Sequence, residues 1–203
     1  MAKPAGSACN LDCAYCFYLS KRALPGGPGS GHMPDEVLER FVKDYIDSVT
    51  SDEVVFSWQG GEPTLLGLEF FEKVVTLQKK HARAGQRIEN DLQTNGTLLD
   101  DDWARFLKQQ RFLVGLSIDG PREIHDHCRI TKHAEPTFDQ VFAAAKMLQK
   151  HGVRFNTLTC VHRYNASRPL DVYRFLRREI GSTYLQFIPI VEPRDFEATA
   201  PGT

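Results

Sequence analysis

The sequence has almost no excess of charge of either sign and no long hydrophobic run. Its 25 Lys and Arg residues nearly balance its 26 Asp and Glu residues, which gives a formal net charge of −1 at pH 7. This balance gives no electrostatic reason to expect a nucleic acid or an anionic membrane as partner. No apolar run approaches the roughly 20 residues of a membrane span, and the N-terminus lacks an apolar signal-peptide core. We therefore expect a soluble cytoplasmic protein.

Length and composition set the scale of the fold. The 203 residues are 41% hydrophobic and 25% charged, so the chain can bury a sizeable core as one domain. One low-complexity stretch, at residues 25–31, is rich in Gly and Pro and indicates a loop. We therefore expect residues 1–203 to form a single domain.

Segments of helical periodicity alternate with short β-branched and aromatic segments along the chain. Thr137 resembles the first residue of a capping box, and Gly152 follows the helix that this box would open. The pattern predicts helices at residues 33–49, 70–82, 100–110, 137–152 and 169–180, and strands at residues 2–4, 53–58, 88–93, 112–118, 154–161 and 184–191.

This alternation predicts an α/β fold with a parallel sheet. Parallel strands need long crossover connections, which are usually helices. The segments form six strand–helix units, of which the last has no helix. A partial (β/α)6 TIM-like barrel and an open doubly wound sheet both fit this order, and periodicity does not choose between them.

The cysteines give the first chemical indication. There are five, an odd number, and three of them, Cys9, Cys13 and Cys16, lie within eight residues. In a reducing cytosol, clustered thiols bind metal more often than they form disulfides. Three cysteines alone suit zinc, with a histidine such as His32 as fourth ligand, about as well as an iron–sulfur cluster. The complete pattern, C-x3-C-x-aromatic-C, favours the iron–sulfur cluster.

Polar motifs follow three of the predicted strands. They are residues 59–62, Thr94-Asn95 and the segment from Ser117 to Asp119. In parallel α/β sheets, ligand sites assemble at the carboxyl ends of the strands. The sequence therefore predicts that these motifs line one site.

Several of these residues also have a simpler interpretation. Gly60 to Pro63 would make an ordinary turn, and Asp119 could cap backbone groups in an Asp-Gly-Pro turn. Taken alone, Arg129 reads as a surface residue, and Cys160 reads as a core residue of an apolar strand. We assign no ligand role to the remaining polar residues of the segment expected to be a loop, namely His125, His127, Cys128 and His133.

Taken together, the motifs resemble those of the radical S-adenosylmethionine (SAM) superfamily, and specifically of its anaerobic sulfatase-maturating enzymes. The likeness spans essentially the whole chain. It rests on Lys3-Pro4, on Cys-Asn-Leu-x-Cys-x-Tyr-Cys-Phe-Tyr at residues 9–18, and on the segments at residues 59–64, 92–97, 115–121 and 185–188.

The resemblance implies two cofactors, a [4Fe–4S] cluster and SAM. Cys9, Cys13 and Cys16 would hold three irons and leave the fourth open to the amine and carboxylate of the methionine moiety. By the same resemblance, Glu62 would contact the SAM ammonium, and Ser117 and Arg129 would contact its carboxylate. Tyr15 would lie near the adenine. The remaining assignments are Gln59, Gly60 and Gly61 in the SAM pocket and Tyr18 in the wall of the substrate cavity.

The resemblance also implies a reaction and its partners. A 5′-deoxyadenosyl radical would take a β-hydrogen from a Cys or Ser in a sulfatase's Cys/Ser-x-Pro-x-Arg segment, and loss of a second electron and a proton would give formylglycine. An electron donor such as flavodoxin or ferredoxin would reduce the cluster. The hard chemistry belongs to the cofactors, and the protein contributes placement and exclusion of water.

The chain departs from the resembled enzymes in length. Those enzymes continue into a cysteine-rich extension with two auxiliary clusters and carry a general-base Asp, none of which residues 192–203 supply. We therefore assign no catalytic base here, and expect a partial barrel that binds SAM and cleaves it slowly without forming formylglycine. Two alternatives stay open: another peptide-modifying radical SAM enzyme, such as one forming thioether crosslinks, and a zinc-binding structural module.

Overall fold

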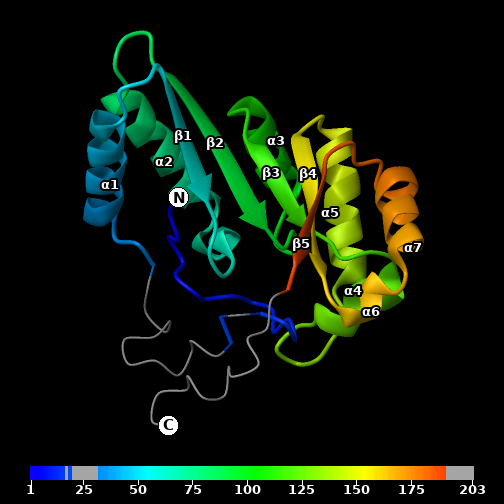
Figure 1. Ribbon diagram of the computed structural model, residues 1–203. Coiled ribbons are helices and arrows are strands. Elements are labelled where there is room, and N and C mark those ends of the chain that lie inside the picture. The colour runs from blue at the N-terminus through cyan, green and yellow to red at the C-terminus, as the bar shows by residue number, and fades with distance from the viewer. Residues whose placement is uncertain (17, 20–31, 191–203) are drawn as a thin grey trace, which may run out of the picture.

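The computed structural model of the protein describes residues 1–16, 18–19 and 32–190. Its centre is one sheet of five parallel strands in the order β1-β2-β3-β4-β5, which curls into a half-barrel (Figure 1). The strands are β1 (Glu53–Trp58), β2 (Arg87–Thr94), β3 (Leu113–Ser117), β4 (Arg154–Val161) and β5 (Leu185–Pro189). The predicted partial TIM-like barrel is therefore confirmed, and the alternative of an open doubly wound sheet is not what the chain forms.

Helices cover the convex side of the sheet and one of its ends. Helix α1 (Asp35–Ser48) precedes β1. Helices α2 (Leu68–His81), α3 (Asp101–Gln109), α5 (Phe138–Lys150) and α7 (Pro169–Arg174) lie between successive strands. The short helices α4 (Arg122–Cys128) and α6 (Arg163–Ala166) lie beyond the carboxyl ends of β3 and β4 (Figure 1). No helix of the described chain is long and apolar enough to cross a membrane.

Strand alternation separates an apolar face from a polar one. On β2, Leu92 and Thr94 are buried toward the helices, whereas Asp91, which precedes Leu92, is half-buried on the other face. Asp91 pairs in register with Ser57 of β1, whose hydroxyl donates to its carboxylate at 2.7 Å. Because successive side chains of a strand point to opposite faces, the concave side carries this polar pair.

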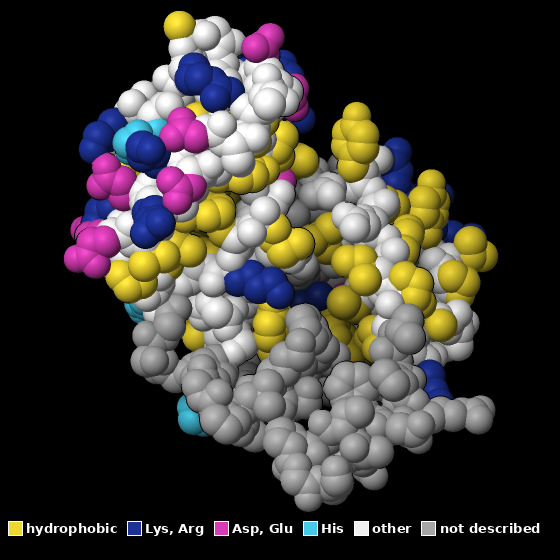
Figure 2. Space-filling view, turned by 60° about the vertical axis from the view of Figure 1, so that its left-hand side comes forward, with side chains coloured by type: hydrophobic (Ala, Val, Ile, Leu, Met, Phe, Trp, Pro, Cys, Tyr) yellow, Lys and Arg dark blue, Asp and Glu magenta, His cyan; other side chains and the backbone are white. Residues whose placement is uncertain are grey.

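Exposed ion pairs link the outer surfaces of the first two helices. Lys73 of α2 pairs with Asp35 of α1, and Lys80 of α2 pairs with Glu39 of α1, each at 2.6 Å. Figure 2 shows Lys, Arg, Asp and Glu side chains interspersed over this part of the surface. Such pairs add little to stability because water and salt screen them, so the helices depend on their apolar face for packing.

One predicted strand is reduced to a single contact. Residues 2–4 do not form a sixth strand, because only Ala2 pairs with Trp58. The Ala2 N–H donates to Ser57 O at 2.8 Å and the Gln59 N–H donates to Ala2 O at 3.0 Å. Pro4 has no N–H with which to continue the ladder, and the chain turns at Gly6, whose N–H donates to Lys3 O.

The capping box predicted at Thr137 is also wrong. The Thr137 hydroxyl donates to Arg129 O at 2.7 Å instead of accepting from its own helix. The carboxylate of Asp126 takes over the capping role, because it accepts the N–H groups of Thr137 at 2.9 Å and of Phe138 at 2.8 Å. A side chain eleven residues earlier therefore begins the helix that sequence reasoning assigned to a local motif.

The segment around residues 122–128 is a helix, not the loop that the sequence suggested. Its inner side chains, Ile124, His125 and Cys128, are buried. The helix expected at 169–180 changes its winding, because residues Phe175–Glu179 form a π-helical turn. The loop predicted at residues 25–31 lies outside the described residues.

Candidate functional site

The three clustered cysteines lie on a short segment that packs against residues 128–130. The Asp12 N–H donates to Ile130 O at 2.8 Å, and the Ala14 N–H donates to Cys128 O at 2.9 Å. These bonds place Cys13 between two fixed backbone positions, and its side chain is buried. Cys9 and Cys16 on either side are half-buried.

The electrostatics of these thiols suit a bound cation. Burial raises the pKa of Cys13 to about 12, Arg129 opposes this rise, and repulsion by Cys9 and Cys16 adds to it. The three sulfurs are therefore close enough to act on one another. A thiolate buried this deeply requires a compensating positive charge, which a metal cluster supplies.

Hydrogen-bond donors already reach one of the sulfurs. Cys9 Sγ accepts from the N–H of Leu11 at 3.4 Å and from Nδ2 of Asn95 at 3.8 Å. N–H donors around sulfur are a common feature of iron–sulfur sites. The donor set therefore fits a three-cysteine cluster. Within the described residues, no group of three His, Cys, Asp or Glu side chains is arranged to hold a single metal ion.

Glu62 lies in the next segment of the site and is completely buried. Its Oε1 accepts from the N–H of Thr64 at 3.0 Å, from the Thr64 hydroxyl at 2.7 Å and from the Thr94 hydroxyl at 2.8 Å. Its Oε2 accepts from the N–H of Asn95 at 2.7 Å. Burial raises the pKa of Glu62, and these hydrogen bonds act against that rise. The carboxylate thus joins the turn after β1, with its short 3-10 helix Pro63–Leu66, to the end of β2.

The two glycines before Glu62 are required by close approach of the chain to itself. A Cβ at Gly61 would lie 2.1 Å from Ala8 O, and one at Gly60, where φ is +130°, would lie 2.7 Å from Gly6 O. The Glu62 N–H donates to Ala8 O at 2.8 Å. The glycines therefore seat the residues that lead into the cysteine segment.

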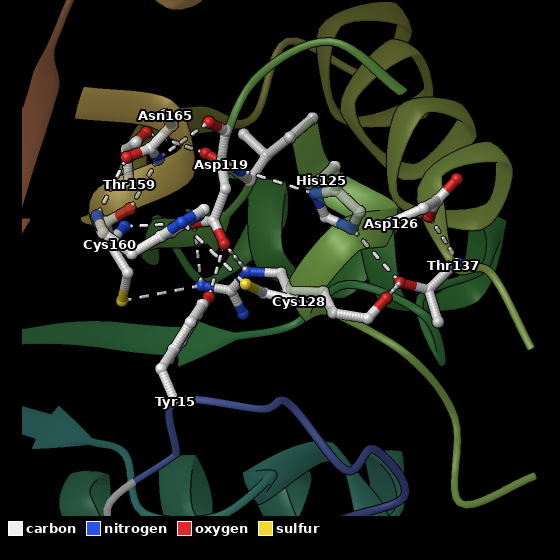
Figure 3. Close-up of polar contacts among 12 residues, drawn as sticks. Tyr15, Asp119, His125, Asp126, Cys128, Thr137, Thr159, Cys160 and Asn165 are labelled. Atoms are coloured by element: carbon white, nitrogen blue, oxygen red, sulfur yellow. Dashed lines mark hydrogen bonds and ion pairs between the residues drawn. The ribbon is translucent and has the colours of Figure 1, made fainter. Parts of the chain in front are cut away.

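Asp119, at the end of β3, is the centre of a second polar cluster (Figure 3). Its carboxylate accepts from Arg129 Nε at 2.9 Å, from Arg129 Nη2 at 3.3 Å and from the N–H of Cys160 at 3.0 Å. The hydroxyl of Tyr15 also donates to it. Although burial acts in the opposite direction, Asp119 holds the pKa of Arg129 well above its usual value.

This cluster connects the cysteine segment to the barrel. Tyr15 lies between Cys13 and Cys16 in the sequence, and the Arg129 guanidinium sits 5.5 Å from the centre of its ring. The Cys160 thiol lies 3.9 Å from Arg129 Nη2. The expectation that Cys160 is a core residue is therefore wrong, because its side chain is half-buried beside the cluster.

His125 is a buried structural histidine. Its Nδ1 accepts from the N–H of Asp119 at 3.4 Å, so its Nε2 carries the proton and donates to the Thr137 hydroxyl at 3.1 Å (Figure 3). Burial, assisted by the positive charge of Arg129, lowers the pKa of His125 to about 3. The ring is therefore neutral, and it fixes the backbone of the Asp119 turn.

The remaining predicted residues occupy the same end of the sheet. Ser117 is buried at the end of β3, and its hydroxyl forms no hydrogen bond within the described part of the chain. Gln59 follows β1 and is half-buried. Tyr18 is half-buried, with Nζ of Lys3 at 5.3 Å from its ring centre. The Glu62 turn, Thr94-Asn95 and the Asp119 cluster thus lie at one end of the sheet, as the strand-end pattern predicted, and the cysteine segment contacts them there.

Sequence reasoning assigned no bonding partner to two polar residues that join these parts. Asn10 and Asn95 hydrogen-bond to each other across 85 residues at 2.9 Å, and Asn10 also donates to the Thr97 hydroxyl at 2.8 Å. The position of Thr94-Asn95 after a strand was the only available signal. It indicated the site and gave no information about the partner.

Comparison with known proteins gives a consistent result. The family model described as the Radical SAM superfamily matches residues 4–176. The serine-type anaerobic sulfatase-maturating enzyme of Bacteroides thetaiotaomicron is 47% identical over 95% of this chain and 46% of its own length. The cysteine-type enzyme of Clostridium perfringens is 46% identical over 95% of this chain and 52% of its own length.

A solved structure agrees. That of native anSMEcpe with bound AdoMet and the Kp18Cys peptide matches with a TM-score of 0.87 and 46% identity, over 94% of this chain and 51% of that one. This chain therefore spans about half the length of the curated relatives that it matches.

Proposed function

Because the chain belongs to the radical SAM superfamily, we propose that it is the cofactor-binding part of an anaerobic sulfatase-maturating enzyme. The observation that carries the proposal is the convergence of the cysteine segment, the Glu62 turn and the Asp119 cluster at the carboxyl ends of the strands. Sequence identity to both the serine-type and the cysteine-type relatives supports the same substrate class. Residues 1–203 would make up one radical SAM core domain.

The superfamily uses a [4Fe–4S] cluster and SAM. Cys9, Cys13 and Cys16 are the proposed cluster ligands, supported by their burial and their mutual repulsion. Together, the bound cofactors supply one-electron cleavage of SAM and a carbon-centred radical that removes hydrogen from the substrate. The chain's own part is to hold the three thiolates, exclude water and orient both reactants.

SAM would bind at the strand ends beside the cysteines. We assign its carboxylate to Ser117 and Arg129, its ammonium to Glu62 and its adenine to Tyr15. Asp119 already holds Nε and Nη2 of Arg129, so a second carboxylate would have to share a guanidinium that is fixed in place. Gln59, Gly60 and Gly61 complete the proposed pocket.

The substrate would be a peptide segment of a sulfatase with the pattern Cys/Ser-x-Pro-x-Arg. Tyr18 is the proposed wall of its cavity, and its half-buried position near the cysteine segment supports this. An electron donor such as flavodoxin or ferredoxin would reduce the cluster, and ligand thiols that must stay reduced favour a cytoplasmic location. No residue of this chain is assigned as the general base.

The proposal is tested on anaerobically reconstituted protein. We expect about four irons and four sulfides per chain, because a Cys-ligated cubane demands them. With a strong reductant and SAM, the protein should release 5′-deoxyadenosine. Cys13→Ala removes one proposed cluster ligand, and it should lose both the iron and sulfide content and the release of 5′-deoxyadenosine. Cys128→Ala removes a thiol outside the motif and should retain them.

Two results would contradict the proposal. One zinc per chain without sulfide would favour the structural-module alternative. If Cys- and Ser-containing sulfatase peptides gave a crosslinked product in place of an aldehyde with the full-length enzyme, the thioether-forming alternative would replace sulfatase maturation.

A further inference from the structure

A buried amide lies against one of the proposed cluster ligands. Asn95 follows the last residue of β2, and its side chain is buried. Its Nδ2 is 3.8 Å from Cys9 Sγ and 2.9 Å from Asn10 Oδ1. The backbone N–H of Leu11 reaches the same sulfur at 3.4 Å. Cys9 is therefore approached by two N–H donors, one from the backbone and one from a side chain.

The orientation of this amide is set by a group that can only donate. Asn95 Oδ1 accepts from the backbone N–H of Thr97 at 2.9 Å. A backbone N–H has no acceptor atom, so the oxygen of the amide must face it and the amino group must face Cys9. The Thr97 hydroxyl adds a second donor to Oδ1 at 2.8 Å.

Neighbouring residues hold the amide rigidly. Asn10 donates through Nδ2 to the Thr97 hydroxyl at 2.8 Å, which closes a ring of hydrogen bonds among the side chains of Asn10, Thr97 and Asn95. The backbone N–H of Asn95 donates to Glu62 Oε2 at 2.7 Å. Asn95 is therefore fixed both through its side chain and through its backbone, and its N–H dipole points at the sulfur without needing to reorganise.

We propose that Asn95 is a positioning residue that makes the cluster easier to reduce, by donating an N–H hydrogen bond to the Cys9 sulfur. The inference rests on the proposed ligand role of Cys9. Reduction adds one electron, taken from the external donor, and makes the cluster more negative by one charge; no proton is transferred and no bond is broken. A fixed N–H dipole stabilises the more negative state, and hydrogen bonds to sulfur are among the factors that set cluster potentials.

The test measures the reduction potential of the anaerobically reconstituted protein by dithionite titration, with the electron paramagnetic resonance signal of the reduced cluster as readout. Asn95→Ala should shift the potential to a more negative value while iron and sulfide contents stay unchanged. Asn156→Ala, a change of the same type at a half-buried position on β4, is the control and should leave the potential at the wild-type value.

A second pair of variants keeps Asn95 itself. Thr97→Val removes the hydroxyl that holds Asn95 Oδ1 and keeps the backbone donor, so it should give a smaller shift in the same direction. Thr97→Ser keeps the hydroxyl and should restore the wild-type potential. This pair decides the question if Asn95→Ala does not take up the cluster.

The outcomes separate this inference from the proposed function. A cluster-loaded Asn95→Ala protein with the potential of Asn156→Ala overturns the role of Asn95 and leaves the proposed function intact. Equal potentials in Thr97→Val and Thr97→Ser also overturn it. If the wild-type protein takes up no cluster, the ligand role of Cys9 falls and both proposals fall with it.

Discussion

The buried pair of Asp119 and Arg129 shows how much the site depends on single charges. Both side chains are almost completely removed from water. Two buried charges of opposite sign tolerate burial only as long as they remain paired and hydrogen-bonded. Asp119 satisfies this condition with additional bonds from Tyr15 and from the backbone of Cys160. One carboxylate therefore fixes the guanidinium, the cysteine segment and the end of β4 together.

Replacing that carboxylate should be costly. Asp119→Asn leaves Arg129 buried without a counter-charge, so we expect the free energy of unfolding to fall by about 3–5 kcal/mol. Urea denaturation of the cluster-free protein measures this. The control is Glu123→Gln, which breaks an exposed ion pair with Arg168 and should leave the urea midpoint nearly unchanged. Equal midpoints for both variants would contradict the structural role of Asp119.

At the scale of elements, the site is a junction of three segments that are distant in sequence. The turn after β1 contacts the residues before the cysteines through Gly61 N–H to Gly6 O at 2.9 Å and Glu62 N–H to Ala8 O at 2.8 Å. On its other side, the cysteine segment bridges to Thr131 at Leu11. The loop is thus clamped between two backbones, and the clamp needs a residue without a side chain on one of them.

Gly61→Ala tests this clamp. Its Cβ would overlap Ala8 O at 2.1 Å, and the next nearest atoms, Ala8 C and Ser7 C, are also backbone, so no side chain can move aside. We expect the variant to be markedly destabilised and to load much less iron. The control, Gly85→Ala, places a Cβ in open space at φ +83° and should cost only about 1–2 kcal/mol from the left-handed backbone. Normal iron content in Gly61→Ala would show that the clamp is not required.

The sheet could be predicted closely because its strands carry their own signals. The predicted strands 53–58 and 154–161 agree with β1 and β4, since β-branched and aromatic runs between helices suffice to identify them. The strand predicted at residues 2–4 does not form, because pairing depends on the neighbouring strand and Pro4 has no N–H to donate to it. The helix α4 was missed because its seven residues mix buried and charged side chains within two turns.

The sequence indicated which segments contribute to the site, but not which hydrogen bonds join them. The cysteine spacing and the polar strand ends are local patterns, and the structure gathers them at one end of the sheet. The bonds that order them join residues far apart, such as Tyr15 to Asp119 and Asn95 to Cys9. Sequence periodicity does not show which way an amide side chain faces or which carboxylate pairs with an arginine, so these roles are seen only in the structure.

At the scale of the whole molecule, one buried ring should govern the response of stability to acid. The folded pKa of His125 is about 3, well below the value of 6.5 of the unfolded chain, so the unfolded state binds the extra proton between these pH values. Stability is therefore fully present above pH 6.5 and is lost as pH falls toward 3, by up to about 1.4 kcal/mol per pH unit.

Removing the titrating ring tests this dependence. His125→Gln keeps a polar group and should be less stable at pH 7, while its stability should fall less steeply than that of the wild type between pH 6 and pH 4. Urea midpoints across this range give the two slopes. Identical slopes would show that His125 does not carry the pH dependence.

The double clamp on the cysteine segment also has a consequence for the order of events during synthesis. The cysteines leave the ribosome well before the backbone groups that hold them, which belong to residues 128–131. Contacts between such distant parts of a chain form late, because a long loop must close first. The thiols therefore remain exposed and unpaired until most of the barrel has been synthesised. During that interval oxygen can oxidise the thiols of the nascent polypeptide before any cofactor has bound.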